Sequence, residues 1–374
     1  MTRELGIGGC ERDLAKLALG IDRARFDPHV ACFVSGGFRA QELERAGLPI
    51  LDLAVPSFRS RSFPSALRRL SGYITSRRIQ ILHALDVPAN LLGAAVGFAR
   101  RVPVVITSQL GARDLYDRRT QRMLRWTDRL AHLVVVNCEF QRQQLISREG
   151  VPASRIAVCY NGVDREDFRP PADPSARRNI LPPPLREASL VIGTVAALRP
   201  EKDLATLIEA FSRVQRVREG MRLVLVGDGP MLETWRSLAE RLGIAPLCHF
   251  EPATANVADW IRAIDIFVLC STSESFSNSL LEAMACGCCP IASRVGGLPE
   301  MIIDEENGLL IEAGNPADLA AKLERVIRDD GLRATLGARA AQHAHAKFSV
   351  QTFVRNMEEL YLSKFRRARP DWPV

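Results

Sequence analysis

The chain has 374 residues, of which 47% are hydrophobic and 25% are charged, a composition that fits a folded protein of two domains. No apolar run is long enough to span a membrane and MTRELGIGG lacks the apolar core of a secretory signal, so we expect a cytoplasmic protein, at most at the inner face of the cell membrane. The net charge of +7 favours an anionic partner, but no nucleic-acid-binding motif accompanies it, and we expect no nucleic acid partner.

The first feature in chain order is a glycine turn, GIGG (6–9), that opens a helical pattern over 11–19. Only MTREL precedes this turn, and these residues are polar and too few for an ordinary strand. The first strand of a doubly wound domain is normally central in its sheet. We therefore predict that this strand is missing, and that the sheet has a gap or an unpaired strand.

Short apolar runs then alternate with helical patterns in both halves of the chain. Runs typical of buried parallel strands lie at 29–35, 79–85, 102–108, 133–138, 156–160, 190–196, 222–227, 264–270 and 288–293. Helical patterns lie at 90–101, 139–150, 203–217 and 279–286. This alternation predicts an α/β fold of two doubly wound, Rossmann-like domains, whose ligands would bind at the carboxyl ends of the strands, in a cleft between the domains.

The domain boundary is predicted within a Pro-rich, polar stretch, RPPADPSARRNILPPPLREAS (169–189). We expect an N-terminal domain over 1–168, a C-terminal domain over 169–352, and a final helix over 353–374.

A basic stretch, FRSRSFPSALRRLSGYITSRR (58–78), carries apolar residues at helical spacing: Phe63, Leu67, Leu70 and Ile74. Such a helix could lie on an anionic membrane that holds a lipid-linked acceptor. The alternative, which we favour, is a helix that packs on its own sheet and leaves its arginines in solvent.

The richest polar pattern follows the run at 264–270. Glu274 lies in the loop STSESFSN at a strand's carboxyl end, and the helix after it, closed by Gly287, offers backbone N–H groups over 277–280 to a phosphate. Glu282 lies inside that helix. With Ser279 it also fits S-x-x-E, a capping box in which the carboxylate only bonds to the helix start.

Two further loops carry candidate residues. Arg199 and Lys202 follow the strand at 190–196 and suit a diphosphate, or are solvated residues of a first helical turn. Gly296 and Gly297 allow close approach of a ligand to the backbone, or form a tight turn. The nine cysteines are typical of a reducing compartment, and the cluster Cys286, Cys288 and Cys289 has no second ligand pair nearby, so we expect no metal.

Together, several motifs in order resemble the retaining GT-B glycosyltransferases of glycosyltransferase family 4. They are GTVAALRPEKDLATLIEAF, LVLVGDGP, ESFSNSLLEAMACGCCPIASRVGGLPEMI and NGLL, with YNGVDREDF and GGCERDL in the first half. The resemblance implies a hexosyltransferase that moves a sugar from a nucleotide-diphosphate sugar, a co-substrate rather than a cofactor, to a glycan or lipid-linked acceptor with retention of configuration.

The resemblance also implies roles for single residues. Glu274 would hold hydroxyls of the donor sugar, Glu282 would hold the ribose, and Arg199 and Lys202 would neutralise the diphosphate. With Glu274, these two cations form the predicted catalytic set. The remaining predicted donor contacts are Ser275, Phe276, Ser277, Asn278, Gly297, Gly8 and Gly9.

Two features of the sequence bear on the mechanism. There is no D-x-D motif, so we expect transfer without a metal, with charge on the departing diphosphate met by cations and helix amides. Where the family often carries a His near the sugar, VVITSQLGARD has Gln109, and His83 near another strand end is either a core residue or a ligand contact. The alternative functions are an epimerase of the sugar nucleotide and a non-catalytic binder of it.

Overall fold

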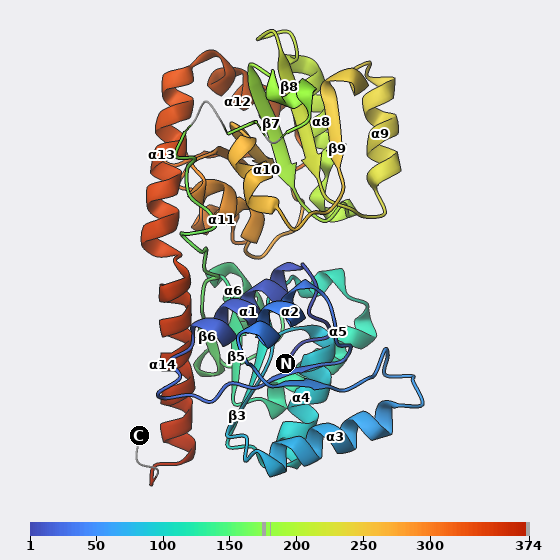
Figure 1. Cartoon of the computed structure of the whole chain (residues 1–374), viewed down its shortest axis with the longest axis vertical. Helices are drawn as coiled ribbons and strands as arrows, with labels where there is room; N and C mark the ends of the chain where they lie inside the picture. Colours follow the sequence, from blue (N-terminus) through green and yellow to red (C-terminus); the bar gives the residue numbers. More distant parts are fainter. Residues whose placement is uncertain (174–176, 180, 372–374) are drawn as a thin grey trace. The chain divides into compact units, whose positions relative to one another are not determined.

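The computed structural model describes residues 1–173, 177–179 and 181–371 of the chain. Contacts between Cα atoms divide the chain into two compact units: unit 1, Met1–Gly162 with Val350–Val374, and unit 2, Val163–Ser349 (Figure 1). Each unit is built on parallel strands with helices on both faces, so the predicted doubly wound α/β architecture is confirmed. No helix in the described ranges is long and apolar enough to cross a membrane.

In unit 1 a pair of strands, β1 and β2, lies apart from a four-stranded sheet of order β3-β4-β5-β6, and all pairs are parallel. The strands are β1 (Val30–Cys32), β2 (Ile50–Asp52), β3 (Ile81–Ala84), β4 (Val104–Gln109), β5 (Leu133–Val136) and β6 (Ile156–Val158). All five runs that we predicted as strands in this half are confirmed. The short edge strand β2 was not predicted.

Residues 1–3 join the pair to the four-stranded sheet. Thr2 forms a parallel bridge with Cys32 of β1, and its N–H donates to Ala31 O at 3.0 Å. On the other side the N–H of Leu85 donates to Met1 O at 3.0 Å. No strand is assigned over residues 1–8, but these backbone bonds fill the central position, because a few extended residues suffice to carry the ladder. The predicted absence of a regular first strand is therefore confirmed, whereas the predicted gap is wrong, because residues 1–3 bridge it.

The helices of unit 1 cover both faces of these strands. On one face lie α1 (Gly9–Gly20), α2 (Phe38–Arg45) and α14 (Val350–Ala368). On the other lie α3 (Phe63–Ser76), α4 (Val87–Ala99), α5 (Arg118–Leu130) and α6 (Glu139–Ser147). Two short 3-10 turns, η1 (Arg113–Leu115) and η2 (Ala153–Arg155), complete the unit.

The apolar side of α3 belongs to the interior of unit 1. Leu70 and Ile74 are buried, and Phe63 and Leu67 pack against the same cluster as strand residues such as Leu82. This side is therefore not available to a membrane, and the alternative that we favoured for residues 58–78, a helix packed on its own sheet, is confirmed.

Unit 2 contains one six-stranded parallel sheet of order β12-β11-β10-β7-β8-β9. Its strands are β7 (Leu190–Val195), β8 (Met221–Val226), β9 (Cys248–Glu251), β10 (Ile266–Leu269), β11 (Cys289–Ser293) and β12 (Leu309–Ile311). The four predicted strands of this half are confirmed, and β9 and β12, at the two edges, were not predicted.

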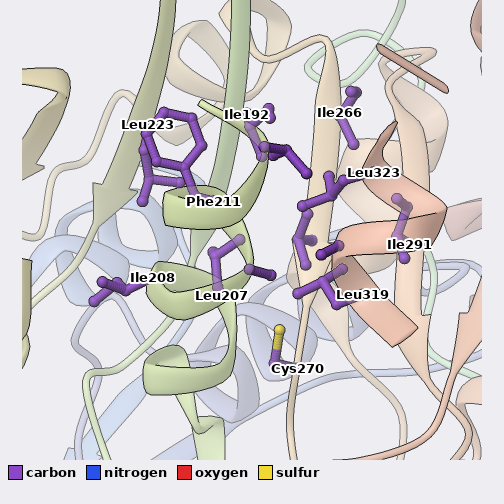
Figure 2. Close-up of a cluster of buried hydrophobic side chains, with 14 of the residues drawn as sticks. Ile192, Leu207, Ile208, Phe211, Leu223, Ile266, Cys270, Ile291, Leu319 and Leu323 are labelled. Carbon is purple, nitrogen blue, oxygen red and sulfur yellow. The ribbon is translucent and has the colours of Figure 1, made fainter. Parts of the chain in front are cut away.

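One face of this sheet packs on α8 (Leu204–Val214), α9 (Leu232–Arg241) and α12 (Pro316–Arg328), and the other on α10 (Val257–Ala263), α11 (Asn278–Ala285) and α13 (Asp330–Lys347). Shorter pieces are α7 (Pro183–Arg186), η3 (Pro200–Lys202), η4 (Ala245–Leu247) and η5 (Leu298–Glu300). Figure 2 shows the core of the first face, where Leu207 and Phe211 of α8 meet Leu319 and Leu323 of α12 over the sheet. These fixed layers position the loops that follow the strands.

Candidate functional site

The strand order of unit 2 places a topological switch point between β7 and β10. From β7 the chain moves to β8 on one side, and later to β10 on the other side, so the loops after β7 and β10 leave the sheet in opposite directions. In open parallel sheets ligands bind outside the carboxyl ends of the strands at such a point. The loops at 196–203 and 270–277, which carry most of the candidate residues, are these two loops.

The loop after β7 is fixed by its own backbone and by the loop after β8. The N–H of Leu198 donates to Asp228 O at 2.8 Å. A Cβ on Gly227 would lie 1.9 Å from Ala196 O, and one on Gly229 would lie 2.4 Å from Leu198 O, so the glycines of VGDGP allow these two loops to approach each other. They serve the packing of the two loops.

Arg199 and Lys202 differ in their surroundings. Arg199 precedes η3 and its side chain is exposed, whereas the side chain of Lys202 is only 18% exposed. The Nζ of Lys202 donates to Oε2 of Glu274, and Glu274 is itself only 15% exposed. The structure therefore brings together two of the three residues that were predicted to be catalytic, although they lie far apart in the sequence.

Further contacts hold Glu274 in the loop after β10. The Oγ of Ser271 donates to Oε2 of Glu274 at 3.3 Å, and the N–H of Thr272 donates to Glu201 O at 2.8 Å, which ties this loop to the loop after β7. Sequence reasoning missed Ser271. Its position immediately after the strand, three residues before the carboxylate, was the available signal.

The N-terminus of α11, which follows this loop, is capped by Ser277 and not by Ser279. Ser277 is the N-cap of α11, and its Oγ accepts from the N–H of Leu280 at 3.3 Å. Because the helix begins at Asn278, Glu282 lies in its second turn and not at the third position of a capping box. The alternative in which Ser279 and Glu282 form a capping box is therefore excluded.

Glu282 is almost fully buried, 1% exposed, on α11. Ser275 and Phe276 are buried as well, and the Phe276 ring packs edge-on against Phe348 at 5.3 Å between centroids. Any contact of Phe276 with a ligand would thus come from its backbone. The N-terminus of α11, with its backbone N–H groups and positive dipole end, lies next to this segment and favours an anion.

The glycines after β11 complete this part of unit 2. Gly296 has a φ of +56°, and a Cβ there would lie 1.6 Å from Glu274 O. The N–H of Gly297 donates to Ser275 O at 2.9 Å. The close approach that these glycines permit is therefore to the loop that carries Glu274, which they hold in place.

Other candidates lie elsewhere. Gly8 is the N-cap of α1 and both Gly8 and Gly9 are exposed in unit 1; their part in donor binding stays a prediction. His83 is half-buried, and its ring nitrogens lie 2.7 Å from the hydroxyls of Tyr361 and Ser108. Loss of solvation, with a smaller effect of the N-terminal ammonium, lowers the pKa of His83 to about 3, so the ring is neutral.

Gln109 is also a buried residue, 2% exposed, at the end of β4. Its Oε1 accepts from Nε of Arg113 at 3.4 Å, and Arg113 forms a buried ion pair with Asp128 at 2.6 Å. Burial raises the pKa of Asp128 despite this partner. Gln109 thus helps to fix the loop after β4.

The cysteine cluster is part of the core of unit 2. Cys286, Cys288 and Cys289 are buried, and Sγ of Cys288 lies 3.3 Å from Ile261 O. Burial raises the pKa of Cys286 and Cys289 to about 12, which disfavours the thiolate that a metal needs. Within the described ranges, no group of three or more His, Cys, Asp or Glu residues could hold a metal ion.

Comparison with known families covers both halves of the chain. Residues 177–343 match the family described as "Glycosyl transferases group 1", and residues 7–167 match "Glycosyltransferase Family 4". The chain belongs to the group 1 glycosyltransferases. The loops after β7, β10 and β11 all lie in the first of these matches, so the candidate site falls within the region that defines this glycosyltransferase family.

Individual relatives agree with this family. D-inositol 3-phosphate glycosyltransferase of Streptomyces bingchenggensis is 33% identical over 277 residues, 71% of this chain and 58% of the relative. N-acetyl-alpha-D-glucosaminyl L-malate synthase of Bacillus anthracis is 31% identical over 49% of this chain and 48% of the relative. The chain thus spans about half to three fifths of the length of these curated glycosyltransferases.

A solved structure shows the same fold. HepE of Anabaena in complex with UDP-glucose superimposes with a TM-score of 0.84 at 23% identity, over 97% of this chain and 99% of that chain. Together with the strand order of each unit, this similarity identifies the fold of the chain as GT-B, with two Rossmann-like domains.

Proposed function

We propose that the chain is a metal-independent glycosyltransferase that moves a hexose-type sugar from a nucleotide-diphosphate sugar to an acceptor with retention of anomeric configuration. The observation that carries this proposal is the Lys202–Glu274 pair at the switch point of unit 2, beside the N-terminus of α11. The family matches support it, as does the UDP-glucose bound to the Anabaena structure of the same fold.

In this proposal the main role of the site is to stabilise the leaving group, the nucleoside diphosphate. When the bond between the sugar and the diphosphate breaks, negative charge grows on the diphosphate oxygens. Lys202, Arg199 and the first amides of α11 would meet this charge in a site of fixed dipoles. No step requires a divalent cation, because these groups supply the positive charge.

The carboxylates would orient the donor. Glu274 would accept hydrogen bonds from sugar hydroxyls, and Glu282, buried on α11, would accept those of the ribose. Before the donor binds, the ion pair of Glu274 and Lys202 neutralises both groups and holds both side chains in position. A diphosphate would then give Lys202 a second anion without a large rearrangement.

The acceptor is the less specific part of the proposal. The names of the relatives contain inositol 3-phosphate and L-malate, which are small hydroxylated anions, and these favour an acceptor of that class. A glycan or a lipid-linked glycan is the alternative. The nine free cysteines support a reducing compartment as the place of the reaction.

The test is release of the nucleoside diphosphate from a panel of UDP-, GDP- and ADP-sugars, with and without these acceptors, in EDTA, with the anomeric configuration of the product read by NMR. Glu274→Gln should lose most of the activity, whereas the matched control Glu305→Gln, on a surface pair with Lys322, should keep it. A changed sugar nucleotide without acceptor would identify an epimerase. Binding without any product would identify a non-catalytic protein, and loss of turnover in EDTA would exclude the metal-independent route.

A further inference from the structure

The charge of the chain is unevenly divided between its two units. Unit 1 carries 29 Lys and Arg against 17 Asp and Glu, a net charge of +12, whereas unit 2 carries 21 against 26, a net charge of −5. The modest net charge of the whole chain therefore hides a strongly basic unit. Since the candidate site for the nucleotide lies in unit 2, the excess in unit 1 calls for a second anionic partner.

Helix α5 concentrates this charge on its outer face. The exposed residues of α5 are Arg118, Arg119, Arg122, Met123, Arg125, Trp126 and Arg129. Five arginines and two large apolar side chains thus share one face, to which the residues of α5 itself add no carboxylate, and the exposed Asp117 caps the start of the helix. Trp126 is 66% exposed, the highest value among the large apolar side chains of the described residues.

The side chains on the inner side of α5 have their packing and ion-pair partners within unit 1. Leu124 is fully buried, and Asp128 pairs with Arg113 at 2.6 Å. On the outer face Arg125 pairs with Glu149, but none of the ion pairs within the described ranges involves Arg118, Arg119, Arg122 or Arg129. The packing of unit 1 therefore accounts for the inner face and leaves four cations and Trp126 turned to solvent.

The neighbouring helix carries a similar pattern at its end. Helix α4 packs against both α5 and α3 (Figure 1). It ends near Phe98, which is 62% exposed, and the exposed Arg100 and Arg101 follow. Exposed arginines beside a single exposed aromatic ring thus occur on two adjacent helices of unit 1.

We propose that the outer face of α5 is a docking surface for a membrane that contains anionic phospholipids. Arginine guanidinium groups pair with lipid phosphates while their stems stay near the acyl chains, and an exposed Trp with an adjacent Met suits the interface between headgroups and acyl chains. The centre of a protein–protein interface is instead poor in charge, which this face is not. This surface is distinct from the buried apolar side of α3, and it does not depend on the proposed sugar transfer.

The test is co-sedimentation of the purified chain with vesicles of phosphatidylcholine alone or with 30% phosphatidylglycerol. The wild type should bind the anionic vesicles only, and binding should fall with added salt. Each arginine near the surface contributes about fivefold, so the triple variant R118S/R119S/R122S should bind about 100-fold more weakly. Trp126→Ser should also weaken binding, and the tryptophan emission of the wild type should shift to the blue on vesicles.

A matched control removes the same charge from unit 2. Arg213, Arg216 and Arg241 are exposed and lie outside the candidate site, and R213S/R216S/R241S should bind vesicles as the wild type does. Equal loss in both triple variants, or no binding by the wild type, would overturn the proposal. Salt-sensitive self-association that R118S/R119S/R122S abolishes, without vesicle binding, would assign the face to a second copy of the chain instead. None of these experiments measures sugar transfer, so their outcome does not depend on whether the proposed function is correct.

Discussion

Gly296 offers a sharp test of how the candidate site is built. Its φ of +56° would cost an alanine about 1–2 kcal/mol, because L-residues are strained in this region. The alanine Cβ would also lie 1.6 Å from Glu274 O. That atom is backbone, so no side-chain rotation can relieve the overlap, and the two loops must move apart by more than ~1 Å to restore an ordinary contact.

The movement has two consequences. It breaks the bond from the N–H of Gly297 to Ser275 O, worth about 1 kcal/mol, so Gly296→Ala should destabilise unit 2 by about 2–3 kcal/mol in total. For a unit of this size that corresponds to a Tm lower by roughly 4–12 °C. It also displaces Glu274, and a misplacement of about 1 Å at a reacting centre lowers kcat/KM by about 100-fold.

The assay compares Gly296→Ala with Gly314→Ala by thermal unfolding and by nucleotide release. Gly314 has a φ of +69°, but a Cβ there would meet nothing within 4 Å. Gly314→Ala therefore carries the backbone strain without the overlap, and should lower the Tm by about 2–8 °C and leave turnover unchanged. If Gly296→Ala has the same Tm and the same turnover as Gly314→Ala, the close approach of Gly296 to Glu274 does not position the site.

Two smaller predictions concern single contacts. The pKa of His83 is about 3 in the folded protein and about 6.5 in the unfolded chain, so protonation of its ring favours unfolding. The stabilisation that comes from the neutral ring is complete above pH 6.5, and it falls by about 2 kcal/mol between pH 7 and 5. Denaturant titrations of wild type and His83→Gln should show a shallower loss in the variant, and an NMR titration of His83 with a pKa above 6 would contradict this. Ser277→Ala should cost about 1 kcal/mol through loss of the cap on Leu280, whereas Ser279→Ala should cost almost nothing. Equal shifts in Tm for the two serine variants would argue against the assigned N-cap.

The fold could be predicted because most of its strands are central and buried on both faces. Runs such as LVIGTV of β7 are apolar throughout and therefore stand out in the sequence. The three strands that escaped prediction, β2, β9 and β12, all lie at the edge of a sheet and have only three or four residues. Edge strands are short and partly exposed, so they leave little periodic signal.

The sequence supplied candidate residues for the site but not the contacts among them. Nothing local indicates that Lys202 reaches Glu274, because the pair forms only when β10 is added beside β7, after two other strands. The sequence left the capping box at Ser279 open for a related reason. Both Ser277 and Ser279 can cap a helix, and the choice depends on where the preceding loop ends, which tertiary contacts decide.

Residues 1–3 are a further case in which tertiary contacts could not be predicted from the local sequence. Its residues are polar and few, and the sequence alone predicted a gap at the centre of the sheet. Backbone hydrogen bonds on both sides fill that position, since ladder bonds do not depend on side-chain character.

The central claim is that the switch point of unit 2 holds the diphosphate of a sugar nucleotide. The most direct measurement is calorimetric titration of UDP and UDP-glucose into the wild type, Lys202→Ala and Lys322→Ala. Both lysines pair with a glutamate in unit 2, but Lys322 pairs at 3.2 Å with Glu305, which is 45% exposed, whereas Glu274 is 15% exposed. We predict that Lys202→Ala weakens binding at least about tenfold, through loss of a charge-assisted contact, while Lys322→Ala binds like the wild type. Unchanged affinity in Lys202→Ala would contradict the account.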